Sequence, residues 1–201
     1  MMKHLFITAL LLFAIVPFSY CQVKSNLELI DIFNMEYVSD PQISPDGSRI
    51  IYVRNFKDVM TDKNLSNLWI VNFDGSNNRP LTIGNNNDFY PKWSHDGKKI
   101  IFKSNKADEN MKLYMMWMDT KESVPLTNTT EVPNDITWSY DDKTLAFNMF
   151  VPKNHESIVK MPSKPEGAKW NTPPIYIDDM NYRGDGQGYL KSGNMQLFTL
   201  P

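Results

Sequence analysis

The sequence has few of the residues that carry most hydrolytic and redox chemistry. Its 201 residues include one cysteine and three histidines. A single cysteine cannot form a disulfide within the chain, which excludes a disulfide-stabilised scaffold. No Gly-x-Ser-x-Gly sequence occurs, so the chain lacks the nucleophile elbow of many serine hydrolases. The histidines supply no replacement, because His4 lies in the N-terminal stretch, His95 in a turn motif, and His155 beside no recognisable nucleophile.

The chain also lacks an excess of charge of one sign. Its 21 Lys and Arg residues oppose 23 Asp and Glu residues, for a formal net charge of −2, and no basic block stands out. This balance argues against a nucleic-acid-binding protein. Hydrophobic residues make up 41% of the chain and aromatic residues 12%, which is enough to build a core. The composition is therefore that of a globular protein rather than a disordered one.

The N-terminus has the layout of a secretory signal peptide. A short positive stretch, Met1–His4, precedes an almost wholly apolar run, Leu5–Val16, which Pro17 ends. Such a run makes about 18 Å of helix, too short for the roughly 30 Å of a bilayer core. The pattern predicts a signal peptide over residues 1–21, cleaved before Gln22. We therefore expect an exported protein, periplasmic or extracellular, with no membrane contact after cleavage.

A lipoprotein signal is the alternative. In that case Cys21 would be retained and acylated, and the protein would be anchored to a membrane. Tyr20 is larger than the residue that such signals favour before the cysteine, so cleavage before Gln22 is the preferred interpretation. The mature chain then contains no cysteine.

Three segments of the chain align without gaps. They are Ile43-Ser-Pro-Asp-Gly-Ser-Arg-Ile-Ile-Tyr-Val53, Trp93-Ser-His-Asp-Gly-Lys-Lys-Ile-Ile-Phe-Lys103 and Trp138-Ser-Tyr-Asp-Asp-Lys-Thr-Leu-Ala-Phe-Asn148, with starts 50 and 45 residues apart. A second motif, Asn67–Asp74, recurs as Lys112–Asp119, and Pro-Leu-Thr follows each copy at the same distance. Two interleaved motifs with one period indicate an internal repeat.

Each repeat is predicted to form short antiparallel strands. Ser-Pro-Asp-Gly favours a turn, because proline presets φ near −65° and glycine accepts a positive φ; Asp142 replaces that glycine in the third copy. Four strands per roughly 45 residues make one blade of a β-propeller. We therefore predict an all-β fold, a partial β-propeller of about three four-stranded blades whose ring is not closed. The expected strands are 42–44, 49–54, 67–73 and 79–82, then 92–94, 99–103, 112–118 and 124–127, then 137–139, 144–150 and 196–200.

Two further segments flank or interrupt the repeats. Residues 22–37 form a leading segment in which 25–35 favours a short helix, capped by Ser25 or Asn26. The blades occupy residues 38–201, with an insertion at about 150–195 before the last strand. A long ordered insertion on a propeller rim is more often functional than not.

The insertion holds candidates for chemistry, and each has a simpler structural interpretation. Gly184–Gly188 is glycine-rich but lacks the Lys-Ser/Thr of a phosphate loop, so we expect a flexible turn. Asp178 and Asp179 beside Arg183 could form a general-acid pair, although carboxylates in loops are commonly solvated. Histidine or cysteine pairs at metal-ligand spacing do not occur. We therefore predict no catalytic, cofactor-binding or metal-binding residue in this chain.

The repeats resemble those of TolB-like proteins, which also form the N-terminal propeller of prolyl oligopeptidase family serine peptidases. This resemblance rests on residues 43–53 and on Asn67-Leu-Trp-Ile-Val. Three further stretches are similar to the acylaminoacyl-peptidase and dipeptidyl-peptidase branch, namely Val38-Ser-Asp-Pro-Gln42, Lys164–Trp170 and Tyr182–Leu190. The resemblance covers residues 25–201.

In that family a propeller of about seven or eight blades caps an α/β-hydrolase domain with a Ser-Asp-His triad. The resemblance implies that this chain is the non-catalytic propeller portion of an exported serine peptidase, which gates and shapes access for peptide substrates. Hydrolysis would be carried by a C-terminal domain outside the chain, and no triad residue can be placed in this sequence. About 180 mature residues are too few to close the ring, so we expect a fragment. The alternative is a TolB-like binding module for a protein or glycan partner, without catalysis.

Overall fold

A computed structural model describes residues 26–106, 110–153, 162–171, 175, 177 and 180–201. The predicted signal peptide, the acylation site at Cys21, His155 and the Asp178–Asp179 pair lie outside these residues. The chain divides into two units, residues 1–32 and 33–201. Within the described ranges, no helix is long and apolar enough to cross a membrane.

The leading segment contains a four-residue helix, α2, at Asp31–Asn34. It is shorter than the helix expected over residues 25–35. The Glu28 N–H donates to the Asp31 carboxylate at 2.9 Å, and the Asp31 N–H donates to the Glu28 carbonyl at 3.0 Å. These local bonds hold residues 28–31 in a turn, in place of the expected first helical turn.

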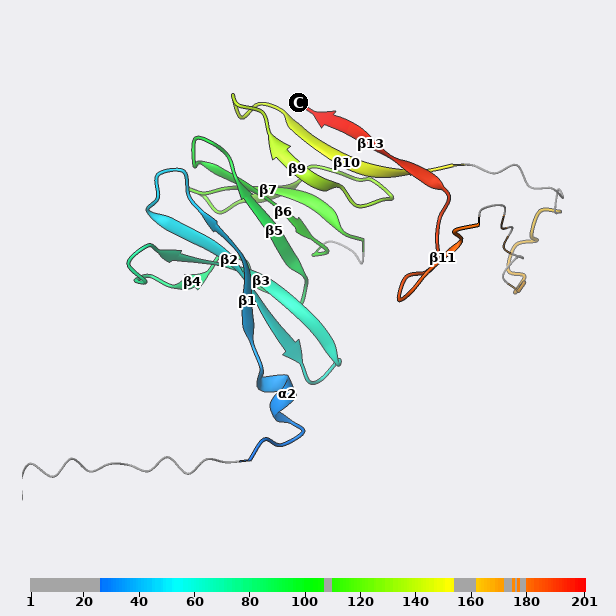
Figure 1. Ribbon diagram of the computed structural model, residues 1–201, viewed down its shortest axis with the longest axis horizontal. Coiled ribbons are helices and arrows are strands. Elements are labelled where there is room, and N and C mark those ends of the chain that lie inside the picture. Colours follow the sequence, from blue (N-terminus) through cyan, green and yellow to red (C-terminus); the bar gives the residue numbers. More distant parts are fainter. Residues whose placement is uncertain (1–25, 107–109, 154–161, 172–174, 176, 178–179) are drawn as a thin grey trace, which may run out of the picture. The chain divides into compact units, whose positions relative to one another are not determined.

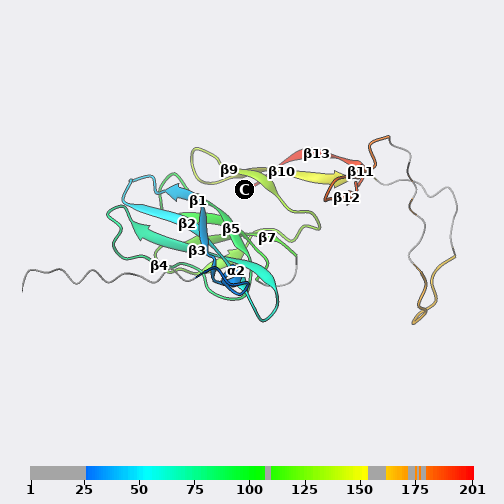
Figure 2. The same cartoon turned by 60° about the horizontal axis from the view of Figure 1, so that its bottom comes forward.

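Residues 33–201 form three antiparallel sheets, which follow one another along the chain in Figures 1 and 2. The first, in the order β1-β2-β3-β4, contains β1 Tyr37–Ile43, β2 Arg49–Asp58, β3 Lys63–Asn72 and β4 Arg79–Pro80. The second, β5-β6-β7-β8, contains β5 Asp88–Trp93, β6 Lys99–Ser104, β7 Lys112–Trp117 and β8 Ser123–Pro125. The third, β13-β10-β9, contains β9 Asn134–Trp138, β10 Leu145–Pro152 and β13 Gly193–Leu200. A separate hairpin joins β11 Arg183–Gly184 to β12 Gly188–Tyr189.

The order of the strands confirms the repeat deduced from the sequence. Each Ser-x-Asp-Gly/Asp turn joins the first strand of a sheet to the second, and the strand expected at 196–200 pairs with β10 as β13. The described part of the third sheet has three strands rather than four. The insertion between β10 and β13 covers residues 153–192, somewhat less than the expected 150–195, because both strands extend further in pairing with each other.

Two apolar cores fill the spaces between successive sheets. One lies between the first and second sheets and includes Ile51, Leu68 and Phe102; the other joins the second and third and includes Ile101 and Phe147. Strand β6 is buried along nearly its whole length, because Ile100 and Phe102 face one core while Ile101 faces the other. The middle sheet is therefore covered on both faces, as in stacked propeller blades.

The repeated turns have the expected backbone. Gly47, Gly97 and Asp142 occupy equivalent positions with φ of 71°, 68° and 55°, and each N–H donates to the carbonyl of the serine three residues earlier. A positive φ favours glycine, and aspartate tolerates it better than most residues. The substitution of Asp142 for glycine is thus compatible with the same turn.

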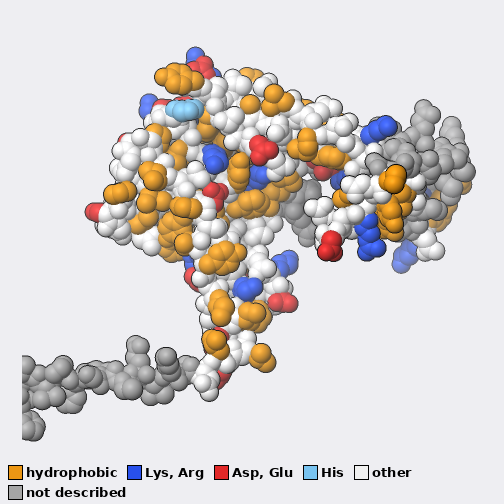
Figure 3. All heavy atoms as spheres, in the orientation of Figure 1, with side chains coloured by type: hydrophobic (Ala, Val, Ile, Leu, Met, Phe, Trp, Pro, Cys, Tyr) orange, Lys and Arg blue, Asp and Glu red, His pale blue; other side chains and the backbone are white. Residues whose placement is uncertain are grey.

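One face of the first sheet carries exposed apolar side chains, which appear in orange over this sheet in Figure 3. Tyr37 and Val38 are 65% and 67% exposed. With Trp69 and Arg54 they line a cavity of about 350 Å³. The Arg54 guanidinium lies 5.3 Å from the Trp69 ring centroid and forms an ion pair with Glu36. These contacts hold the Arg54 guanidinium between the Trp69 ring and the Glu36 carboxylate.

Candidate functional site on the first strands of the sheets

The first strand of each sheet contains a β-bulge at the same place in the repeat. The pairing register shifts between Ser39 and Gln42 in β1, between Phe89 and Lys92 in β5, and at the matching point of β9. At each bulge one residue takes the left-handed conformation. These residues are Asp40 (φ 47°), Tyr90 (φ 60°) and Asp135 (φ 48°).

Of these three residues, Tyr90 has the backbone conformation with the highest free-energy cost. Aspartate populates the left-handed region fairly often, whereas a bulky aromatic residue there is an outlier that costs about 1–2 kcal/mol. Bulges frequently redirect a side chain near a functional site, and a strained residue that persists is a reason to suspect function. The bulge redirects Tyr90 toward the third sheet, where it packs against the second core.

Tyr90 links the second and third sheets. Its side chain packs against the second core, which includes Ile136 of β9. Burial raises the pKa of the Tyr90 phenol, and the carboxylates of Asp135 and Asp40 raise it further, while the backbone of Ile136 opposes the change. The phenol is therefore fully protonated at neutral pH and can donate a hydrogen bond. It lies among side chains from the first strands of all three sheets.

Two ammonium groups face the Tyr90 ring. Lys103 Nζ lies 4.9 Å and Lys92 Nζ 5.1 Å from the ring centroid, within the range of cation–π attraction. Lys103 is 5% exposed, and its ammonium donates to Asn134 Oδ1 of the third sheet at 2.7 Å. Burial lowers the pKa of Lys103, and the Asp135 carboxylate partly opposes this shift. Lys103 and Tyr90 thus join the same two sheets through polar contacts.

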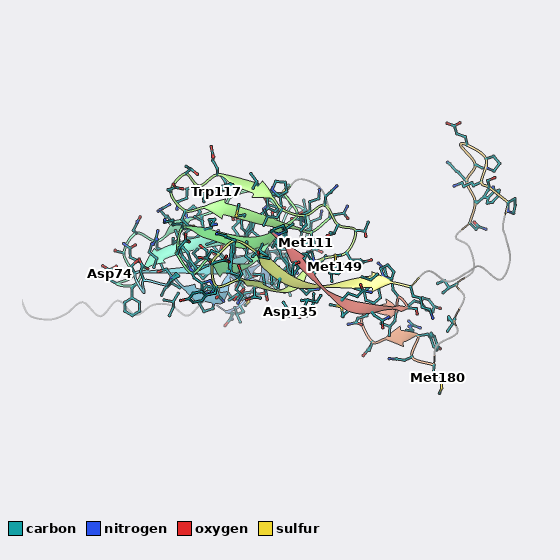
Figure 4. The ribbon with its side chains drawn as sticks, turned by 90° about the horizontal axis from the view of Figure 1, so that it is seen from above. Asp74, Met111, Trp117, Asp135, Met149 and Met180 are labelled. Atoms are coloured by element: carbon teal, nitrogen blue, oxygen red, sulfur yellow. The ribbon has the colours of Figure 1, made fainter. Side chains whose placement is uncertain are left out.

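The two bulge carboxylates have simpler surroundings. Gln42 Nε2 donates to Asp40 Oδ1 at 2.7 Å, and Asn148 Nδ2 donates to Asp135 Oδ2 at 3.2 Å. Asp135 is exposed and Asp40 is partly exposed. Figure 4 shows Asp135 at the margin of the stacked sheets. We call Asp40, Tyr90 and Asp135 the bulge row; it offers an acceptor, a donor and an acceptor along one side of three sheets.

The side chains of this row can accept hydrogen bonds from a polar ligand and donate hydrogen bonds to it. In the part of the chain that the structure describes, no three acidic, histidine or cysteine side chains come together as metal ligands would. Carboxylates and a neutral phenol are suited to the N–H, carbonyl and ammonium groups of a peptide.

The residues weighed as candidates from sequence lie elsewhere. His95 belongs to the second turn, where its ring contacts Asp142. Gly184–Gly188 forms the tight hairpin β11–β12, and Arg183 lies over the Tyr189 ring at 5.9 Å. The sequence did not lead to a prediction of the bulge row, although it contains one signal for these residues. Its members precede the three turn motifs by the same three residues, and two of the three are aspartates.

The sequence of the chain is similar to those of known peptidases. No family model matches the chain. The chain is 28% identical over 175 residues to the uncharacterized peptidase YuxL of Bacillus subtilis, a match that covers 87% of this chain and 26% of that protein. It is 41% identical over 70 residues to dipeptidyl-peptidase 5 of Porphyromonas gingivalis, covering 35% of this chain and 10% of that protein. The chain thus spans about a quarter or less of the length of these relatives.

Solved structures agree with the relationship at the level of the fold. An acylaminoacyl peptidase in complex with Z-Gly-Gly-Phe-chloromethyl ketone superposes with a TM-score of 0.63 at 18% identity, over 84% of this chain and 24% of that one. The acylaminoacyl peptidase of Pyrococcus horikoshii gives a TM-score of 0.62 at 18% identity, over 84% and 23%. The matches in sequence and fold confirm the resemblance seen in the repeats, which is to the propeller part of prolyl oligopeptidase family peptidases.

Proposed function

We propose that this chain is the non-catalytic propeller portion of an exported serine peptidase and that it shapes the access of peptide substrates. Hydrolysis would be carried by an α/β-hydrolase domain in another part of the same protein. The observation that carries the proposal is the match to a peptidase over 87% of the chain. The chain itself offers no Gly-x-Ser-x-Gly nucleophile elbow.

The bulge row would be the part of this chain that meets the substrate. Asp40 and Asp135 can accept hydrogen bonds from peptide N–H groups or an ammonium, and the protonated phenol of Tyr90 can donate to a peptide carbonyl. The strain at Tyr90 supports this role, because a tyrosine in the left-handed region brings a cost that a purely structural position could avoid with glycine or aspartate.

The test uses the product of the complete reading frame that contains this chain. We expect it to hydrolyse a chromogenic dipeptide and a longer unstructured peptide. Tyr90→Phe and Asp135→Asn should raise KM for the longer peptide while leaving kcat for the dipeptide unchanged. Asp62→Asn, at an exposed turn between β2 and β3, serves as the control and should change neither value.

Two results would count against the proposal. If the complete product cleaves no peptide but retains a protein or glycan partner, the binding-module alternative replaces the peptidase. If hydrolysis occurs but Tyr90→Phe and Asp135→Asn behave like the control, the peptidase assignment stands and the role of the bulge row is wrong.

A further inference from the structure

In the first sheet, the side chain of Asp40 in the bulge row is bonded by a neighbour on its own strand. Gln42 follows Asp40 by two residues in β1, and its Nε2 donates to Asp40 Oδ1 at 2.7 Å. In the part of the chain that the structure describes, this is the hydrogen bond that the Asp40 side chain accepts, and Oδ2 accepts none. A carboxamide carries no net charge, so Gln42 orients the carboxylate without neutralising it.

The second sheet repeats this relationship with a different contact. Lys92 follows Tyr90 by two residues in β5, and its ammonium lies 5.1 Å from the centroid of the Tyr90 ring. Residues two apart in a strand project to the same side, which brings each neighbour within reach of the bulge side chain. The residue two positions after the bulge therefore contacts the bulge side chain in both of the first two repeats.

The third sheet reaches the same result from a neighbouring strand. The equivalent position is Thr137, whose hydroxyl donates to the Trp138 carbonyl at 3.5 Å rather than to Asp135. Asn148 of β10 supplies the contact instead, because its Nδ2 donates to Asp135 Oδ2 at 3.2 Å. Each carboxylate of the bulge row thus accepts a hydrogen bond from a carboxamide.

Gln42 is itself bonded to the second sheet. The Trp93 Nε1–H donates to the Gln42 carbonyl at 3.1 Å, and the Trp93 ring packs against the core between the first two sheets. The Arg49 guanidinium lies 5.4 Å from the centroid of the same ring. The junction between the two sheets therefore fixes the backbone of Gln42, and the Gln42 side chain extends that constraint to Asp40.

We propose that Gln42 is a positioning residue, which holds Asp40 in the orientation in which it binds a peptide substrate. This inference rests on the proposed function, because Asp40 acts there as part of the bulge row. Gln42 occupies Asp40 Oδ1, so Oδ2 is the atom that accepts from a peptide N–H. A carboxylate that is oriented before the peptide arrives loses less conformational entropy on binding than a free one.

The test uses the complete product with the chromogenic dipeptide and the longer peptide. Gln42→Met removes the carboxamide with little change in size. It should raise KM for the longer peptide about fivefold, which corresponds to one typical hydrogen bond, with a smaller effect on kcat. Thr137→Val is the matched control, since it changes the same position of the third repeat, and it should leave KM unchanged.

Gln42→Glu provides a second variant of nearly the same shape. It replaces the amide donor by a carboxylate, which repels that of Asp40, so it should raise KM for the longer peptide at least as much as Gln42→Met. The value of kcat for the dipeptide reports whether each variant is folded, because a general loss of structure would lower it as well.

A double-mutant cycle shows whether Gln42 acts through Asp40. Asp40→Gly suits the positive φ of this position and removes the carboxylate. By itself it should raise KM for the longer peptide. In the Asp40→Gly background, Gln42→Met should have no further effect, because the group that it positions is absent.

The outcomes separate this inference from the proposed function. The positioning role is overturned if Gln42→Met or Gln42→Glu behaves like Thr137→Val, or if Gln42→Met raises KM equally with and without the Asp40 carboxylate. In these cases hydrolysis by the wild type and the effect of Asp40→Gly would leave the proposed function intact. A complete product that cleaves neither peptide would overturn the proposed function and the positioning role together.

Discussion

The Asp142 carboxylate of the third turn accepts hydrogen bonds from both the backbone N–H and the imidazole Nδ1 of His95 in the second turn, at 2.9 and 2.8 Å. It also accepts from the Asp96 N–H at 2.9 Å. The equivalent positions at the preceding junction are Pro45, which has no N–H, and Gly97, which has no side chain. A Cβ placed on Gly97 would lie 3.6 Å from Pro45 Cδ. The two junctions therefore use different contacts, one polar and one apolar.

Replacing Asp142 by glycine should destabilise the protein. Glycine suits the positive φ of this turn, so the change removes hydrogen bonds without adding strain. Because the bonds involve a carboxylate that is only 11% exposed, we expect a loss of about 1–3 kcal/mol in the free energy of unfolding. Urea denaturation measures it. Asp62→Gly is the matched control, since Asp62 also has a positive φ (52°) and is exposed; equal losses for the two variants would show that the bonds contribute nothing.

The contribution of Asp142 should also depend on pH. Burial by itself would raise the pKa of Asp142, but the N–H groups of His95 and Asp96 and the imidazole of His95 lower it overall. A lowered carboxyl pKa stabilises the folded state above the ordinary value of about 3.9, and this stability is lost as the pH falls through the lowered value. The difference in stability between the wild type and Asp142→Gly should shrink below pH about 4. A difference that stays constant down to acid denaturation would contradict this assignment.

The serine that begins each turn lowers the pKa of the carboxylate within that turn. Ser44, Ser94 and Ser139 donate through Oγ to Asp46, Asp96 and Asp141, at 2.5, 2.7 and 2.6 Å. These bonds lower the pKa of all three carboxyls.

Replacing Ser44 by alanine tests this relationship directly. The Ser44 hydroxyl, helped by the N–H and hydroxyl of Ser48, lowers the pKa of Asp46 to about 2. Ser44→Ala should move that pKa back toward its ordinary range while leaving the pKa of Asp96 unchanged. NMR titration of the side-chain carboxyl carbons measures both. An unchanged Asp46 would mean that the backbone of the turn, rather than the serine, sets its pKa.

Lys103 should be replaceable by a side chain of similar length without charge. Val53 and Asn148 occupy the equivalent positions of the other repeats. Lys103→Met loses the bond to Asn134 and the contact with Tyr90 but no longer buries an ammonium, so we expect a change within about 1 kcal/mol. Lys103→Ala leaves a cavity between two sheets and should cost about 2 kcal/mol or more.

The difference in stability between the wild type and Lys103→Met should also depend on pH. The pKa of Lys103 is lowered in the folded state. Between this lowered pKa and the ordinary lysine value of about 10.4, the unfolded chain therefore binds more protons than the folded chain does, and folding becomes more favourable as the pH rises. The wild type should therefore gain stability relative to Lys103→Met over this alkaline range. Parallel stability curves for the two proteins between neutral pH and about 10 would show that Lys103 is not destabilised by burial.

Processing of the N-terminus discriminates between the two signals considered from sequence. We expect the mature exported protein to begin at Gln22, because the apolar run is short and Tyr20 disfavours acylation at the next residue. Mass spectrometry of the protein isolated from its native host measures the new terminus. A lipid-modified Cys21 at the first position would replace this expectation with a membrane-anchored form.

Much of the fold follows from patterns within a single repeat. The two motifs that recur with one period predicted the strands, and proline, aspartate and glycine predicted the turns between them. The bulges were not predicted, because neither the repeat nor the turn residues reveal an extra residue inserted in one strand of a pair. Tyr90 lay outside the expected strand 92–94, and its place in β5, its conformation and its contacts came only from the structure.

The candidate site could be predicted less well than the fold, because its contacts depend on the packing of one sheet against another. Arg49 and Trp93 are 44 positions apart in the sequence, and this separation gives no reason to associate them. They meet because stacking of the second sheet on the first brings the end of β5 to the start of β2. Likewise, Lys103 is buried only because the third sheet packs against the end of β6, where its ammonium donates to Asn134.

The sequence by itself determined the elements and their order, since turn chemistry and the alternation of side chains act over a few residues and repeat with the motif. Only the tertiary structure decided which side chains meet between sheets. Those contacts depend on the stacking of β6 between two neighbours, on bulges that give Asp40, Tyr90 and Asp135 a left-handed backbone, and on the burial of Lys103 against Asn134 of the third sheet. Such features arise from the approach of whole sheets, whose burial of apolar surface outweighs the local cost of a strained tyrosine or a crowded lysine.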